Sequence, residues 1–242
     1  MAEPFLECPS HWRKGTLEPD SKEGLIVAAD TGTTPRTEIE RYWDGDIPWL
    51  TPKEISRRRG GIFVSTTERT ITREGLVGSS LKLHPVGTVM LTKRAPVGMV
   101  AVNTASMTVN QGFLAFTCGL HLRSTYLAYW LIANRPYFEQ VANGSTYPEL
   151  YVGDLFEFEI SVPPVEYQDQ VIQVIKALQF ASMLALPMEQ VLGDSIQIAR
   201  IHAYRDRMED LIRNVLILLL SGKLDVRHLK SKIEGILNEK SP

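Results

Sequence analysis

The chain has 242 residues, of which 44% are hydrophobic and 22% are charged, and its formal net charge is -2. These proportions are typical of a soluble globular protein that can bury one good core, or one domain with a substantial appendage. No apolar run reaches the roughly 18 residues that a membrane span requires, so we expect a cytoplasmic protein without a membrane segment.

Charge and composition also narrow the functional class. A net charge of -2 lacks the basic surplus of a strong free-standing nucleic-acid binder, although local clusters of basic residues matter more than the sum. The only cysteines, Cys8 and Cys118, are too few for a disulfide framework or a cysteine zinc site. The five histidines lack ligand spacing, and no glycine-rich phosphate-binding loop occurs. The sequence therefore predicts no catalytic residue, no metal and no cofactor.

Two tryptophans stand close together in the stretch YWDGDIPWLTPKEI, residues 42–55. Trp43 and Trp49 flank a predicted turn, and their large apolar area favours packing in the core, with base stacking as the alternative. The densest basic cluster follows, and it contains Lys53, Arg57, Arg58 and Arg59. Because arginine can grip phosphates or fork onto guanine, we predict nucleic-acid contact here, with a solvated surface run as the alternative.

Short apolar runs in the following segment predict strands. Residues 86–102 read as strand, turn and strand, while 113–117 and 156–162 read as single strands, the last because Phe156, Phe158 and Ile160 alternate. Lys93 and Arg94 precede the turn, where a loop can present charge to a groove, or where they serve the fold alone.

One stretch of this half has helical spacing, and polar residues surround it. We predict a helix over residues 124–142, with Ser124 as its N-cap and a break near Asn134 caused by Pro136. Amide and hydroxyl groups that can pair with bases or phosphates come before and after this helix. They are Asn110, Gln111, Ser145, Thr146 and Tyr147.

The period becomes helical beyond Pro163 and Pro164. We predict a helix over 167–186, a long helix from Met188 to Ser221 with Gly222 as its C-cap, and a short last helix over 226–239. The long helix carries apolar residues at heptad spacing, which pack on the preceding helix of the same chain or on a second subunit. They are Ile201, Tyr204, Met208, Leu211, Val215 and Leu218. The run VLILLL, residues 215–220, favours a further subunit, because it is apolar on every side.

Six groups of residues, in order along the chain, resemble the signatures of the specificity subunits of type I restriction-modification enzymes. They are residues 32–55, 70–98, 110–113, 142–150, 162–172, and the closing pair 204–212 with 221–227. The resemblance implies an α+β chain, with a mixed α/β target-recognition domain over 1–162 and a long-helix arm, coiled coil or hairpin, over 163–242. It also implies a subunit without catalysis of its own.

The same resemblance implies partners. Such subunits read a split sequence in double-stranded DNA, and they position methylation subunits, and with them restriction subunits, on it. Family members usually carry two recognition domains, whereas this chain has one, so it resembles a half-length form. A homodimer or a pair with a different half-length subunit is implied. The alternatives are a fragment of a fused restriction-methylation enzyme and a scaffold with an inactive recognition domain.

Overall fold

The computed structural model describes residues 8–20, 24–57, 61–142, 149–183, 210–224 and 226. The chain forms two compact units, which we describe separately. The first contains Arg13–Val162, and the second contains the described residues of 8–12 and of 163–226.

A five-stranded sheet forms the centre of the first unit, with the order β2 (Ile26–Thr31), β9 (Phe113–Cys118), β6 (Val89–Thr92), β7 (Val100–Asn103) and β4 (Phe63–Val64). All neighbours are antiparallel except β4 and β7, which are parallel. The predicted strand, turn and strand over 86–102 and the strand over 113–117 are confirmed. Every residue of β6 and β7 is buried, and all of them are apolar except Thr92 and Asn103, which end the two strands.

A second, three-stranded sheet has the order β5 (Thr70–Ile71), β3 (Trp43–Leu50) and β8 (Thr108–Val109). The prediction that the two tryptophans flank a turn is wrong, because both lie within β3. Trp43 and Ile47 both pair with Ile71, so the residues between them form a bulge. Asp44 there has φ 59°, a left-handed conformation that aspartate tolerates better than most side chains. The helix α2 (Arg73–Gly78) follows β5, capped by the Thr72 hydroxyl, which accepts from the Gly75 amide.

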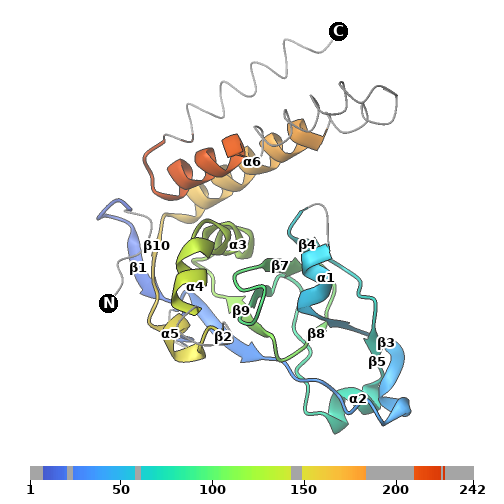
Figure 1. The fold of residues 1–242 in the computed structure, drawn as a ribbon. Helices are drawn as coiled ribbons and strands as arrows, with labels where there is room; N and C mark the ends of the chain where they lie inside the picture. Colours follow the sequence, from blue (N-terminus) through green and yellow to red (C-terminus); the bar gives the residue numbers. More distant parts are fainter. Residues whose placement is uncertain are drawn as a thin grey trace, which may run out of the picture. The chain divides into compact units, whose positions relative to one another are not determined.

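Two helices replace the single interrupted helix predicted over 124–142. They are α3 (Ser124–Ala133), which packs against β6 and β7, and α4 (Arg135–Ala142) (Figure 1). The break at Asn134 is confirmed, since Pro136 has no amide hydrogen and fits the first turn of a helix. The predicted N-cap is wrong, because Arg123 takes that position and Ser124 is the first helical residue.

The last strand of this unit is shorter than predicted. Residues 152–156 form a helical turn, α5 (Val152–Phe156), and β10 (Glu159–Val162) pairs with β1 (Arg13–Thr16). The predicted alternation holds from Phe158 onward, since Phe158, Ile160 and Val162 are buried, but Phe156 belongs to α5, which buries Leu155 instead.

The second unit contains α6 (Val165–Met183) and a helical segment over 210–220, which run side by side (Figure 1). The Tyr167 hydroxyl of α6 lies 3.2 Å from the Leu219 carbonyl oxygen and 3.3 Å from that of Leu224. Gly222 ends the helical segment with φ 66°, as predicted for a C-cap glycine. Residues 184–209 and 227–242 lie outside the described part, so most of the predicted long helix and the last helix do too.

The mixed α/β character is confirmed, with sheets and helices in the first unit. Within the described residues, none of the helices combines the length and the apolar composition that crossing a membrane would take.

Candidate nucleic-acid interface

Three distant segments meet at one edge of the first unit. β3 and β8 are parallel, so Thr51 after β3 and Asn110 after β8 leave the sheet at the same end. The Asn110 amide donates to the Leu50 carbonyl at 3.0 Å, and the Lys93 amide donates to the Gly112 carbonyl at 2.8 Å. The structure thus brings together five of the predicted contact residues, which we call the polar edge: Lys53, Lys93, Arg94, Asn110 and Gln111.

Lys53 reaches this edge on the short helix α1 (Pro52–Arg57), which is fixed by a buried carboxylate. Glu54 is 8% exposed, and its Oε2 accepts from the Thr51 amide at 2.8 Å and from the Thr51 hydroxyl at 2.7 Å. Its Oε1 accepts from the Glu68 amide at 2.6 Å. The bond from the Thr51 amide is the carboxylate half of a capping box, and the Lys53 side chain remains exposed.

The arginine cluster is only partly described. Arg57 is exposed at the end of α1, with Nη1 3.7 Å from Glu68 Oε1. An exposed pair at that distance is weak, so it leaves the guanidinium available to another anion. Arg58 and Arg59 lie outside the described residues.

The loop that carries Asn110 and Gln111 is held by its own side chains. Asn110 Oδ1 accepts from the Gly112 amide at 2.6 Å, which shapes the turn before β9. Gln111 is exposed, and its Oε1 accepts a hydrogen bond from the Thr34 hydroxyl. Gly112 lies against the start of α1, where an added Cβ would meet Pro52 Cγ at 2.8 Å. The loop and α1 are therefore in direct contact.

Lys93 and Arg94 share one carboxylate. Glu149 Oε1 lies 3.3 Å from Lys93 Nζ and 3.0 Å from Arg94 Nε. The hydrogen bond from Arg94 is the main cause that lowers the pKa of Glu149. The Leu150 amide donates to the Lys93 carbonyl at 2.8 Å, which anchors this segment by its backbone as well. Ser145, Thr146 and Tyr147 come just before it and lie outside the described residues.

The tryptophans are buried, as their apolar area predicted. Their rings lie edge to face with centroids 5.1 Å apart. The Trp43 and Trp49 indole nitrogens donate to the carbonyls of Arg36 and Thr33 at 3.2 and 3.0 Å. The exposed Arg69 lies over the Trp43 ring with its Cζ 3.5 Å from the centroid. Arg69 could not be predicted from the sequence, because 26 positions separate it from Trp43 and no local pattern marks the pair.

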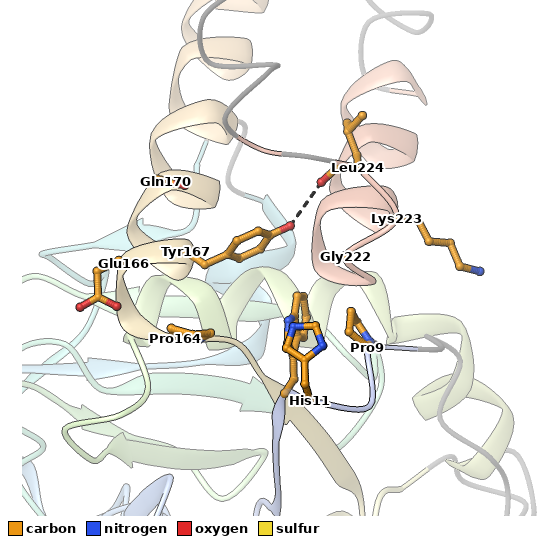
Figure 2. A pocket seen from close by; sticks show the side chains of 10 residues that line it. Pro9, His11, Pro164, Glu166, Tyr167, Gln170, Gly222, Lys223 and Leu224 are labelled. Atoms are coloured by element: carbon orange, nitrogen blue, oxygen red, sulfur yellow. Dashed lines mark hydrogen bonds between the residues drawn. The ribbon is translucent and has the colours of Figure 1, made fainter.

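A pocket of about 650 Å³ lies in the second unit, between residues 9–12, the start of α6 and residues 222–224. Figure 2 shows Tyr167 reaching from α6 toward the Leu224 carbonyl at its wall. The rings of Trp12 and Tyr167 lie 5.4 Å apart. Two prolines and two aromatic rings give this lining packing area, and Glu166 and Lys223 add charged groups to it.

The described residues offer little reactive chemistry. They contain no group of three His, Cys, Asp or Glu side chains that could hold a metal ion. Burial raises the pKa of Cys118 to about 12, so its thiolate is suppressed at neutral pH. The polar edge instead offers cations and side-chain amides, which suit phosphate oxygens and base edges.

The comparisons with known proteins agree on one protein family. Residues 23–182 match the family model described as the type I restriction modification DNA specificity domain. The chain is 40% identical over 147 residues to the specificity subunit of the type I restriction enzyme MjaIX of Methanocaldococcus jannaschii, a match that covers 60% of this chain and 34% of that protein. It is 25% identical over 150 residues to the EcoR124I/EcoR124II specificity subunit of Escherichia coli, covering 60% of this chain and 36% of that one.

Solved structures share the fold. The HsdS subunit from Thermoanaerobacter tengcongensis matches with a TM-score of 0.53 and 18% identity, over 92% of this chain and 48% of that one. A chain from a structure of the type I R-M system matches with a TM-score of 0.54 and 19% identity, over 92% and 49%. This chain therefore covers about half the length of those structures, and its matches cover about a third of the curated relatives.

Proposed function

Because the chain belongs to the family of type I restriction modification DNA specificity domains, we propose that it is the DNA-recognition subunit of a type I restriction-modification enzyme. It contacts one part of a bipartite duplex target and directs methylation subunits, and restriction subunits with them, to that target. It contributes recognition and no catalytic residue. The observation that carries the proposal is the convergence of the segments of Lys53, Arg94 and Gln111 at one edge.

The predicted contact residues, at the polar edge and outside it, have different roles in the proposal. Lys53 and Arg57 are exposed, and they contact phosphates or guanine together with Arg58 and Arg59. Asn110 and Gln111 read base edges, as do Ser145, Thr146 and Tyr147. Lys93 is mostly buried, with 13% of its side chain exposed, so it acts on DNA mainly through its charge, while Arg94, at 49%, can touch it.

The arm of residues 163–242 forms the dimer and docks the methylation subunits in this proposal. Within the described part of the predicted heptad seam, Leu211 and Leu218 are 48% and 40% exposed and Val215 is half-buried. In the helical segment over 210–220, the buried residues are instead Leu216, Leu219 and Leu220. An exposed leucine face supports a second copy, or another half-length subunit, as its cover. Ile201, Tyr204 and Met208 lie outside the described residues.

DNA binding by the full chain with its methylation subunit tests the proposal. Fluorescence anisotropy of a labelled duplex is measured at several salt concentrations for wild type and for Lys53→Ala combined with Arg57→Ala. We expect the salt slope to fall by up to about 2, because two phosphate contacts are lost. Lys14→Ala combined with Arg73→Ala is the control for a change of charge alone, because it removes two exposed cations of the first unit that are not among the predicted contact residues. An unchanged slope in the double variant argues against DNA contact by Lys53 and Arg57.

Two further measurements separate the alternatives. Strong specific binding by the isolated chain in a mobility-shift assay would contradict the expectation, drawn from its net charge of -2, that tight binding needs the complex. Replacing Arg57, Arg58 and Arg59 with alanine tests the inactive scaffold, since a scaffold leaves DNA binding by the complex and its salt dependence unchanged. Methyltransferase activity in the chain alone would favour the fused-enzyme fragment.

A further inference from the structure

Two cations of the polar edge, Lys93 and Arg94, share a single carboxylate of the same unit. Lys93 Nζ and Arg94 Nε lie 3.3 and 3.0 Å from the same oxygen of Glu149. Two positive charges facing one negative charge leave a net charge of about +1 at this point. A DNA phosphate that approaches Lys93 or Arg94 therefore meets a site where an internal anion is already bound.

The carboxylate is held there by more than the ion pairs. Arg94 and Glu149 form an isolated antiparallel bridge, and the Leu150 amide donates to the Lys93 carbonyl at 2.8 Å. These backbone contacts keep Glu149 beside the two cations even when an ion pair opens. Since the Lys93 amide in turn bonds to Gly112, the acid also lies next to the loop of Asn110 and Gln111.

Partial burial makes this arrangement stronger than an ordinary surface pair. The side chains of Lys93 and Glu149 are 13% and 25% exposed, whereas those of Arg57 and Glu68 are 59% and 63% exposed. Water screens the shielded charges less, so their attraction is larger at the same distance. The lowered pKa of Glu149 fits a carboxylate that remains ionised while it competes with phosphate.

We propose that Glu149 is an internal competitor of DNA phosphate, which suppresses non-specific binding by occupying Lys93 and Arg94. This inference rests on the proposed function. A mixed-sequence duplex supplies phosphates and few base contacts, so displacing Glu149 is not compensated. A target sequence also supplies base contacts to the neighbouring loop, and the exchange becomes favourable. Glu149 is thus a specificity-determining residue that acts through the two cations.

The test uses a labelled mixed-sequence duplex and the full chain with its methylation subunit, because the inference concerns affinity that is independent of sequence. Glu149→Gln keeps the size of the side chain and removes its charge. We expect about 3-fold to 10-fold tighter binding at low salt, and a salt slope steeper by about 1 to 2 as one or two cations become available. Glu74→Gln is the matched control, because it removes a carboxylate from the exposed Arg41 pair with the same change of net charge.

A double-mutant cycle tests whether the effect of Glu149→Gln acts through Lys93 and Arg94. In a Lys93→Ala, Arg94→Ala background, Glu149→Gln is expected to add no more affinity than Glu74→Gln does. If Glu149→Gln does not fold, Glu149→Asp replaces it, since the shorter side chain loosens both contacts and is expected to tighten binding by about 2-fold.

Failure of this inference and failure of the proposed function give different results. Binding by Glu149→Gln that equals or falls below that of the control overturns the inference while leaving the proposed function intact. A gain that persists in the Lys93→Ala, Arg94→Ala background overturns it too, since the effect then does not act through these cations. A wild-type complex that binds no duplex at any salt concentration overturns the proposed function, and the inference with it.

Discussion

Replacing Glu54 with alanine is expected to destabilise the first unit and to disorganise the start of α1. The carboxylate accepts from the Thr51 amide at 2.8 Å, from the Thr51 hydroxyl at 2.7 Å and from the Glu68 amide at 2.6 Å. It is 8% exposed, so water replaces these bonds only in part. Hydrogen bonds to a charged group contribute about 1.5 to 3 kcal/mol each, and three that share one acceptor group are not additive. We therefore expect a loss of about 3 kcal/mol in the free energy of unfolding.

Urea unfolding followed by circular dichroism measures this loss. In a chain of this size about 3 kcal/mol corresponds to roughly 6 to 12 °C in Tm. Glu54→Gln is expected to lose less, because its amide keeps one acceptor oxygen. The control is Glu74→Ala, which removes an exposed carboxylate paired with Arg41 and is expected to cost less than about 1 kcal/mol. A loss below about 1 kcal/mol for Glu54→Ala would refute the reasoning, since the carboxylate would then not support the cap.

Three other predictions concern the second unit, the arm and the core. Gly222→Ala is expected to destabilise the chain by more than about 1 kcal/mol in urea unfolding, because its φ is 66° and the added Cβ meets Pro9 Cγ at 2.6 Å. In the same assay Gly153→Ala is expected to be neutral or stabilising, because the space around it in α5 is open. Leu211→Glu combined with Leu218→Glu is expected to shift the mass measured by light scattering from dimer to monomer, and a wild-type monomer would contradict the proposed arm. Burial lowers the pKa of His84 from 6.5, so the unfolded state binds the proton more tightly. Stability is then fully present above pH 6.5 and falls as the pH drops below it, a dependence that His84→Gln is expected to remove.

The parts of the fold that the sequence predicted correctly depend on local rules. The β6 and β7 runs were recognisable because both of their faces are buried, and the helix break at Asn134 because Pro136 has no amide hydrogen to donate. The bulge after Trp43 could not be recognised from the sequence, because its register is set by Ile71 of another strand. The helical turn α5 was missed for a related reason, since Phe156 and Phe158 fit either period and only tertiary burial decides.

The candidate site was also only partly predictable from the sequence. Residue types suggested Lys53, Arg94 and Gln111 one at a time, and their roles in DNA contact remain predictions. Their convergence depends on the parallel pairing of β3 with β8, which joins residues 59 positions apart. A parallel contact at that separation leaves no periodic trace in the sequence, so the edge could not have been predicted as one surface.

A net charge of -2 does not contradict the proposed DNA contacts, because acids and basic residues lie side by side at the candidate site. Three of its acids lie beside the basic residues: Glu54 holds α1 beneath Lys53, Glu68 faces Arg57, and Glu149 faces Lys93 and Arg94. Each carboxylate cancels charge in the sum while it fixes where a cation or its helix lies. Under the proposed function, a near-neutral total is compatible with DNA recognition, and the salt dependence of binding tests it better than the sign of the net charge does.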